Sequence, residues 1–328
     1  MFYFFCQGPY EILDNSVFTM QLITNLKEIT SPFKNAVVTI GNFDGVHVGH
    51  QDLFRQVIEK AKVLGGQSVV ITFEPHPTRV LNCNKHFPMI TLYEQKVELI
   101  SKTNIDVLLC IPFTPEFAAI PARAFVEGIL WNTIGMKAII VGPDYSFGKK
   151  REGNIDLLRE IGEKLGFDVI ISDWIEQGPH RISSTEIRNL VKEGKVGAAS
   201  KLLGRLYQIR GTVKCGRDRG GKLLGFPTAN LTLYDELCPK TGVYAVTVEY
   251  KENSYKGVAN IGYSPTFNNG QFNLEVHIFD FHQNIYGQLI RVNFVQRLRE
   301  EIKFPGPEAL ATQIRKDIIR AKEILSKR

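Results

Sequence analysis

The chain has 328 residues, of which 44% are hydrophobic and 23% charged, an ordinary balance for a globular protein with room for two domains. Its formal net charge is +6, but its lysines and arginines are spread along the chain and form no dense basic block. A solvated basic surface, which also suits anionic nucleotides, is therefore favoured over a nucleic-acid groove. The five cysteines show no C-x-x-C pair and no zinc spacing, which favours reduced thiols and a cytoplasmic location.

The first segment, residues 1–19, contains no lysine or arginine. Its apolar run is too short for a signal peptide or a membrane span, so no membrane association is expected. We predict that residues 1–19 are a weakly ordered N-terminal extension.

The first motif is a strand, a glycine turn and a helix. Residues 36–40 are a β-branched run typical of a buried parallel strand, and residues 50–64 show helical spacing. Between them stands Gly-Asn-Phe-Asp-Gly-Val-His-Val-Gly-His, residues 41–50. Its glycines let the backbone approach phosphates, and the following helix offers free N–H groups to an anion. His47 and His50 are three residues apart and are expected on one face, so phosphate chemistry is favoured over a plain helix cap.

Strands and helices continue to alternate up to residue 204. Strands are predicted at 67–73, 105–111, 137–141 and 169–172, and helices at 91–103, 121–131, 154–165 and 184–204. This order predicts a parallel sheet with right-handed crossovers, in which ligands bind beyond the carboxyl ends of the strands. The turns at 41–50, 74–77 and 142–151 fall at that edge.

A second candidate for phosphate binding is Arg-Ile-Ser-Ser-Thr-Glu-Ile-Arg, residues 181–188. Ser184 is expected to cap a helix, with Thr185 and Arg188 in its first turn. A plain capping motif explains the serines but does not require the two flanking arginines, so phosphate binding is favoured.

After residue 207, short alternating runs separated by Gly, Pro and Asn replace the α/β pattern. Antiparallel strands are predicted at 209–213, 243–250, 255–261, 274–281 and 289–294, followed by a helix at about 307–325. Many short strands without helices between them indicate a small β-barrel. We therefore predict an α/β domain at 20–205 and a barrel domain at 206–328.

The barrel domain contains Gly-Phe-Pro-Thr-Ala-Asn, residues 225–230. Thr228 and Asn230 are two residues apart, so in an extended segment their side chains leave the same side. A hydroxyl and an amide oxygen are hard ligands suited to Mg²⁺ that carries nucleotide phosphates. Taken alone, the segment is explained as well or better by an Asx or Ser/Thr turn before a strand.

Together these motifs resemble the family of bifunctional bacterial riboflavin kinase/FAD synthetases, over residues 20–326. Residues 41–50 resemble the long form of the His-x-Gly-His signature in the adenylyltransferase half, and residues 181–188 its triphosphate motif. Residues 221–230, 239–245, 258–267 and 274–277 resemble the kinase half. The resemblance implies a nucleotidyltransferase-like Rossmann domain followed by an antiparallel β-barrel with a C-terminal helix. The implied partners are ATP with Mg²⁺, riboflavin and FMN, without nucleic acid, in a monomer or weak homo-oligomer.

The resemblance also implies roles for single residues. In the kinase half, Glu275 would be the general base, Thr228 and Asn230 the Mg²⁺ ligands and Arg299 a flavin contact. In the other half, His47 and His50 would stabilise the transferring phosphate. Nucleotide contacts in the two halves would come from Gly41, Phe43, Asp44, Gly45, Gly49, Asp144, Arg151, Ser183, Ser184, Thr185, Arg188, Gly225 and Pro227.

Some positions depart from the family pattern. Lys222 and Ser146 stand where arginine is usual, and Tyr145 stands where phenylalanine is usual. The loss of a guanidinium fork concerns affinity more than activity. Two alternatives remain open: one active half only, or transfer of AMP to another phosphate acceptor. A non-catalytic flavin-binding or RNA-binding protein is disfavoured, because Glu275 and both histidines are retained.

Overall fold

The computed structural model describes residues 20–82, 87–173, 176–177, 180–214, 225–233, 236–263 and 272–327. The predicted extension at 1–19 and the departure at Lys222 lie outside these residues. The chain divides into two compact units. The α/β unit comprises residues 1–42, 51–84 and 97–173, and the barrel unit comprises residues 43–50, 85–96 and 174–328.

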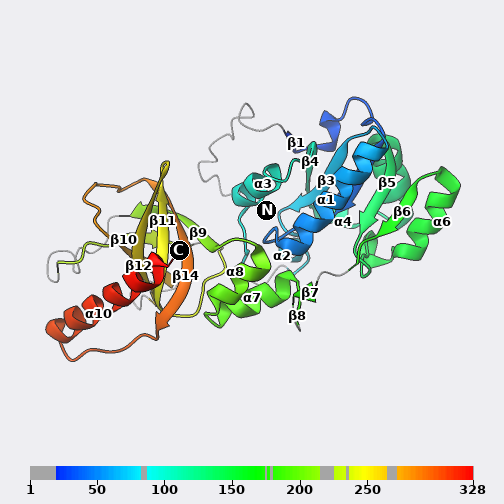
Figure 1. Ribbon diagram of the computed structural model, residues 1–328. Helices are drawn as coiled ribbons and strands as arrows, with labels where there is room; N and C mark the ends of the chain where they lie inside the picture. The colour runs from blue at the N-terminus through cyan, green and yellow to red at the C-terminus, as the bar shows by residue number, and fades with distance from the viewer. Residues whose placement is uncertain are drawn as a thin grey trace, which may run out of the picture. The chain divides into compact units, whose positions relative to one another are not determined.

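The α/β unit is built on a six-stranded sheet with the order β1-β4-β3-β2-β5-β6 (Figure 1). Its strands are β1 (Gln21–Ile23), β2 (Ala36–Ile40), β3 (Ser68–Glu74), β4 (Val107–Pro112), β5 (Met136–Val141) and β6 (Asp168–Ile171). Every neighbouring pair is parallel, as the alternation of strands and helices predicted. The three-residue β1 was not predicted, because it is too short to show a period.

Helices connect these strands. They are α1 (Val48–Val63), α2 (Pro77–Leu81), α3 (Tyr93–Ser101), α4 (Pro115–Ala118), α5 (Ala122–Ala124), the π-helix η3 (Phe125–Thr133) and α6 (Ile155–Leu165), with short 3₁₀ turns η2 (Leu26–Glu28) and η4 (Lys149–Arg151). α6 shows how the sequence sets helix ends. The Asn154 side chain accepts a hydrogen bond from the Leu157 N–H, and Gly166 ends the helix in the left-handed region.

The barrel unit contains a closed antiparallel barrel with the strand order β10-β13-β12-β11-β14-β9. Its strands are β9 (Tyr207–Lys214), β10 (Ala229–Thr232), β11 (Gly242–Tyr250), β12 (Asn253–Tyr263), β13 (Phe272–Ile278) and β14 (Leu289–Arg299), and a separate small sheet pairs β7 (Glu176–Gln177) with β8 (His180–Arg181). The short β10 was not predicted as a strand. β13 ends at Ile278, three residues earlier than predicted, because the chain turns at Asp280 with a φ of +54°.

The barrel strands bury apolar side chains on both faces of the sheet. Leu231, Leu274 and Val276 point inward and belong to the interior cluster. On the outer face, Val243, Ala245 and Val258 form a second apolar cluster with Ala321 and Leu325. The latter two residues lie on α10 (Pro307–Ser326), which therefore covers part of the outer face of the barrel (Figure 1).

Two more helices pack with the barrel, namely α7 (Ser184–Lys192) and α8 (Val196–Leu203). Their buried side chains join the interior cluster: Ile187, Val191, Val196, Ala199, Leu202 and Leu203. It remains a prediction that the chain divides after residue 205 into two domains that fold independently.

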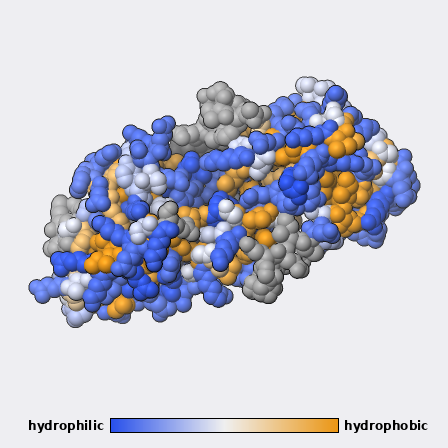
Figure 2. Space-filling model, viewed as in Figure 1, coloured by the Kyte–Doolittle hydropathy of each residue, from blue (hydrophilic) through white to orange (hydrophobic). Residues whose placement is uncertain are grey.

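Hydrophilic residues cover most of the face seen in Figure 2, with hydrophobic groups between them. Large exposed hydrophobic side chains are spread over several elements: Val63, Leu81, Tyr286, Leu289, Ile302 and Ile319. In the part of the chain that the structure describes, no helix is long and apolar enough to span a membrane.

The packing of α7 and α8 leads to a stability prediction. A fragment of residues 206–328 should melt at a lower temperature than one of residues 180–328, because it lacks the helices whose apolar faces join the barrel cluster. Burying one such aliphatic side chain contributes about 1.5–3 kcal/mol. Thermal melts followed by circular dichroism would measure the difference, and equal melting temperatures would contradict the prediction.

Candidate functional site

The turn between β2 and α1 has an unusual backbone. Phe43, Gly45 and Val46 have φ values of +48°, +89° and +41°. A positive φ is rare for a β-branched residue such as valine, and such conformations cluster at functional sites. Gly45 is also tightly enclosed, since a Cβ there would lie 3.2 Å from Ile90 Cγ2 and 3.4 Å from Leu203 Cδ2.

Asp44 holds this turn in place. Its side chain is 1% exposed, and its carboxylate accepts hydrogen bonds from Ile90 N–H at 3.2 Å and from Thr91 N–H at 3.0 Å. The same carboxylate forms a salt bridge with Arg188. The Asp44 backbone carbonyl accepts a hydrogen bond from Ser184 Oγ at 2.8 Å. Asp44 therefore ties the turn to residues 90–91 and to the start of α7.

His47 and His50 lie together at the start of α1, as their spacing predicted. Their rings stack with centroids 3.5 Å apart, and the edge of the pair meets Phe43, whose centroid is 5.1 Å from that of His50. His47 Nδ1 accepts a hydrogen bond from the His50 backbone N–H at 3.3 Å. His47 thus caps the helix, and its ring proton is on Nε2. Gly49 makes room for this ring, since a Cβ there would lie 3.2 Å from it.

The surroundings keep both imidazoles neutral. Burial, together with the positive charge of Arg205, lowers the pKa of His47 to about 4. Burial also lowers the pKa of His50 well below its ordinary value, and the charges of His47 and Arg205 act in the same direction. At pH 7 the two histidines can therefore donate hydrogen bonds to an anion but carry no full charge.

The 181–188 motif starts α7, but the predicted cap was wrong by one residue. Ser183 is the cap, because its Oγ accepts a hydrogen bond from the Glu186 N–H at 3.2 Å. Ser184 is the first helical residue and uses its hydroxyl on Asp44. Thr185 is exposed at this helix start. Arg188 also stacks on Phe87, with its guanidinium carbon 4.3 Å from the ring centroid.

Asp144 and Arg151 belong to the α/β unit, where both line a cavity of about 660 Å³ beyond β5. Arg151 Nε donates a hydrogen bond to Ser146 Oγ at 2.7 Å. The serine that replaces the usual arginine therefore serves to orient Arg151. Gly41, at the end of β2, donates its N–H to the Ile71 carbonyl at 3.1 Å.

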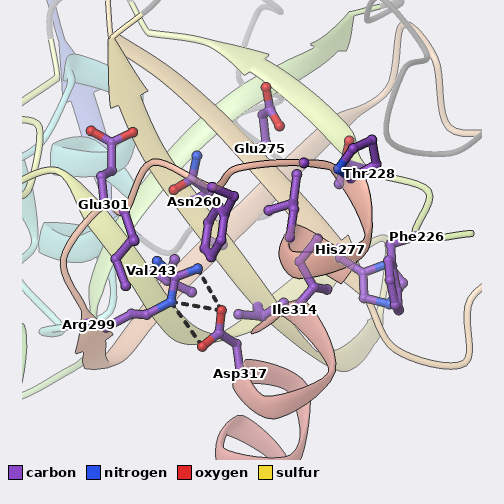
Figure 3. A pocket seen from close by; sticks show the side chains of 17 residues that line it. Phe226, Thr228, Val243, Asn260, Glu275, His277, Arg299, Glu301, Ile314 and Asp317 are labelled. Atoms are coloured by element: carbon purple, nitrogen blue, oxygen red, sulfur yellow. Dashed lines mark hydrogen bonds and ion pairs between the residues drawn. The ribbon is translucent and has the colours of Figure 1, made fainter. Parts of the chain in front are cut away.

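The second candidate site is a cavity of about 610 Å³ on the outer face of the barrel (Figure 3). One wall carries Val243 and Val258 from the strands, and the other carries Leu310 and Ile314 from α10. Glu275 and Thr228 lie at the polar end of the same cavity. The site therefore offers an apolar slot with a carboxylate beside it.

Glu275 is placed by strand pairing. On β13 it lies opposite Asn230 of β10 and Asn260 of β12, so the three side chains share the outer face. Asn273 Nδ2 donates a hydrogen bond to Glu275 Oε1 at 2.9 Å. Partial burial raises the pKa of the Glu275 carboxyl, against the opposing effect of that hydrogen bond. A carboxylate with a raised pKa is a better proton acceptor.

The segment before β10 places the two predicted metal ligands. Thr228 lines the cavity and Asn230 faces Glu275 across the strand pair. Gly225 has a φ of +75°, with no atom near the position of a Cβ. The Pro227 carbonyl accepts a hydrogen bond from His277 Nδ1 at 2.8 Å. His277 therefore anchors the segment before β10. The position of His277 on the same strand face as Glu275 did not predict this role.

Arg299 is held by α10. Its Nε and Nη2 donate to the Asp317 carboxylate at distances of 2.8–3.0 Å, as the dashed lines in Figure 3 mark. Asp317 is 6% exposed, and Gln313 Nε2 donates to it as well, at 2.9 Å. The guanidinium forms part of the cavity wall, so its position depends on the packing of α10.

The buried state of His47 predicts how stability changes with pH. Its pKa is about 4 in the folded chain, against an ordinary 6.5, so between these values the unfolded chain binds a proton that the folded chain does not. The free energy of unfolding should therefore fall as the pH decreases from about 6.5 to about 4. Melting temperatures measured across this range should fall less steeply for His47→Gln than for the wild type. His282→Gln, which changes an exposed histidine, should leave the slope unaltered, and a His47→Gln slope equal to the wild type would refute the prediction.

Comparison with known proteins places the chain in a family. Residues 29–186 match the FAD synthetase family and residues 203–325 match the riboflavin kinase family. A bifunctional riboflavin kinase/FMN adenylyltransferase of Buchnera aphidicola subsp. Acyrthosiphon pisum is 40% identical over 300 residues, which cover 90% of this chain and 95% of the relative. A relative of the same description from Escherichia coli strain K12 is 36% identical over 306 residues, covering 93% and 97%.

A solved structure is similar to this one over nearly the whole chain. A Streptococcus pneumoniae protein, described as a macrolide-efflux protein, has a TM-score of 0.84 and 33% identity, covering 93% of this chain and 99% of that chain. The resemblance seen in the motifs is thus confirmed along the chain and in both halves. The chain belongs to the bifunctional riboflavin kinase/FMN adenylyltransferase family.

Proposed function

We propose a role for each site residue in the two activities of this family. The chain is a riboflavin kinase, which makes FMN, and an FMN adenylyltransferase, which makes FAD. The observation that best supports the residue assignment in the kinase is the position of Glu275, a partly buried carboxylate at the polar end of an apolar cavity.

In the kinase reaction, Glu275 takes the proton from the terminal ribityl hydroxyl of riboflavin. The hydroxyl oxygen then attacks the γ-phosphate of ATP, and ADP leaves. Most of the catalysis comes from positioning and charge neutralisation. The apolar walls formed by Val243, Val258 and Ile314 suit the flavin ring, and Gly225 and Pro227 bring the β10 segment to the nucleotide.

Thr228 and Asn230 suit the Mg²⁺ that accompanies ATP. Their side chains supply a hydroxyl and an amide oxygen, and Asn230 Nδ2 donates to the Thr228 carbonyl at 3.3 Å, which turns the amide oxygen away from that carbonyl. Oxygen donors of this kind fit a hard cation that keeps part of its water shell. The metal would neutralise phosphate charge in the transition state.

Arg299 has a positioning role in this scheme. Because its guanidinium forks onto the buried Asp317 carboxylate, it fixes the wall between β14 and α10. We therefore assign Arg299 to shaping the flavin slot, with any flavin contact made through the part that faces the cavity.

In the adenylyltransferase reaction, a phosphate oxygen of FMN attacks the α-phosphate of ATP, and pyrophosphate leaves. No protein nucleophile is needed. His47 and His50 donate hydrogen bonds to the phosphate oxygens on which charge develops. Thr185 and the N–H groups at the start of α7 offer a second anion-binding point.

We assign a supporting role, without direct substrate contact, to Asp44, Arg188 and Ser184. Their polar groups are engaged with one another in the structure. They therefore hold the turn between β2 and α1 that carries His47 and His50, here called the histidine turn, against α7. Phe43 packs on His50 in the same way. In the α/β unit, Asp144 and Arg151 are assigned to substrate contact in their own cavity. The five cysteines show no C-x-x-C pair, which supports a cytoplasmic location for the enzyme.

Glu275→Gln tests the kinase assignment. The substitution keeps the size and shape of the side chain but removes the proton acceptor, so riboflavin phosphorylation should fall by roughly 10²–10⁴-fold. The same protein should convert supplied FMN to FAD at the wild-type rate. Separation of the flavins over time measures both reactions.

The pH profile adds a second measurement. Because burial raises the pKa of Glu275, the kinase rate of the wild type should fall on acidification at a higher pH than an exposed glutamate would give. Glu252→Gln, at an exposed glutamate of the β11–β12 turn, is the matched control. Normal phosphorylation by Glu275→Gln would remove Glu275 from the mechanism.

His50→Ala tests the adenylyltransferase assignment. Loss of one preorganised donor to a developing phosphate charge costs about 10²–10³ in rate, so FAD formation should slow by that factor while FMN formation continues. His282→Ala should change neither rate. Near-normal FAD synthesis by His50→Ala would mean that this histidine serves only to build the helix start.

A further inference from the structure

Arg205 is a cation whose Nε has no hydrogen-bond partner among the described residues. It follows α8 directly and is half-buried. Its Nη1 donates to the Leu203 carbonyl at 3.4 Å, and its buried Nε has no hydrogen-bond partner within the described ranges of the chain. Among the residues that the structure describes, no carboxylate forms an ion pair with it.

The surroundings of Arg205 belong to the candidate adenylyltransferase site. The Leu203 carbonyl accepts the hydrogen bond from Arg205, and the Leu203 side chain lies against Gly45 in the histidine turn. The charge of Arg205 acts on both His47 and His50. His50 Nδ1 is likewise buried and has no partner in the part of the chain that the structure describes. Two buried nitrogen atoms with no partner thus stand in one part of the barrel unit.

Such an arrangement is costly unless something pairs with it. A guanidinium withdrawn from water needs a compensating charge and acceptors for its N–H groups. Asp44 cannot fully supply them, because its carboxylate is engaged by Arg188 and by the N–H groups of residues 90 and 91. Phosphate oxygens, which carry negative charge and accept several hydrogen bonds, would satisfy the free Nε–H.

We propose that Arg205 is an anion-binding residue of the adenylyltransferase site, which pairs with the polyphosphate of ATP beside His47 and His50. The proposal rests on the assignment of those two histidines. Because both histidines are neutral, Arg205 supplies the positive charge that they lack. Arg205 lies in the part of the chain that matches riboflavin kinase, residues 203–325.

A purely structural role gives different expectations. Arginine near a helix C-terminus interacts favourably with the last carbonyls, an effect of about 0.3–1 kcal/mol at exposed positions. That role explains the bond to Leu203 but leaves Nε without a partner. Removing a cap lowers the melting temperature, whereas removing an anion-binding group lowers affinity for polyphosphate.

The test uses the full chain with Arg205→Gln and Arg205→Lys. Binding of inorganic pyrophosphate with Mg²⁺ is measured by calorimetry, and FAD formation from supplied FMN is measured by flavin separation. We expect Arg205→Gln to reduce FAD formation by about 10²–10³-fold, as for loss of one preorganised donor, and to weaken pyrophosphate binding. Arg205→Lys should recover part of both, because it restores the charge without the planar fork. Riboflavin phosphorylation by the same samples should stay normal and reports that the barrel unit is folded.

A spectroscopic measurement tests whether the charge of Arg205 acts on His47. Removal of the Arg205 charge should raise the pKa of His47, which NMR titration of the imidazole signals measures. Arg320→Gln, at an exposed arginine of α10, should alter none of these quantities. Unchanged pyrophosphate affinity and FAD formation in Arg205→Gln, with only a lower melting temperature, would overturn the proposal.

Measuring His50→Ala in parallel separates a failure of the Arg205 proposal from a failure of the proposed adenylyltransferase site. Loss of FAD formation in His50→Ala but not in Arg205→Gln overturns the role of Arg205 alone. If neither variant is impaired, the histidine turn is not the adenylyltransferase site and the role of Arg205 is rejected with it. Impairment of both, with normal kinase activity, supports the proposal.

Discussion

The arrangement of the proposed adenylyltransferase site depends on one buried carboxylate. Asp44 holds the histidine turn, the 90–91 segment and the first turn of α7 together through its oxygens and its backbone carbonyl. Removing one partner of such a buried network leaves the others unsatisfied, which is more costly than the bonds are worth singly. The strained φ values of Phe43 and Val46 persist because these contacts over-determine the turn.

Burial shifts the pKa of an ionisable group at each site, downward at the first site and upward at the second. Withdrawal from water disfavours the charged form of any group, so it lowers the pKa of His47 and raises that of Glu275. The result suits each task. In the proposed roles, neutral histidines donate hydrogen bonds to phosphate, whereas a more basic carboxylate accepts a proton. The positive charge of the first site then has to come from elsewhere, and in our proposal Arg205 supplies it.

The kinase site depends on the two faces of the barrel strands. The inward residues fill the interior, and the outward residues divide between an apolar patch under α10 and a polar row that includes Asn230, Asn260 and Glu275. The cavity forms where the patch meets the row. The Arg299–Asp317 pair fixes the helix at that border, so the flavin slot and the phosphate end are built by the same strands.

Much of this protein can be predicted from its sequence, because the decisive patterns are local. Period-two and period-3.6 spacing predicted both fold classes, and the long histidine motif together with the four segments of the kinase half predicted the family. Local pattern failed at β1 and β10, which are too short to show a period. It also placed the α7 cap on the wrong serine, since either of two adjacent serines can cap a helix.

Only the tertiary structure decided how the polar residues are used. Sequence places Asp44 and Arg188 144 residues apart, and nothing in either motif says that they pair with each other. The same holds for Arg299 with Asp317 and for His277 with Pro227. Arg205 belongs to no recognised motif, and the proposal for it rests on a buried Nε that has no partner among the described residues. Hydrogen bonds and desolvation act between neighbours in space, so the fold must bring the groups together before their charges and proton affinities are set.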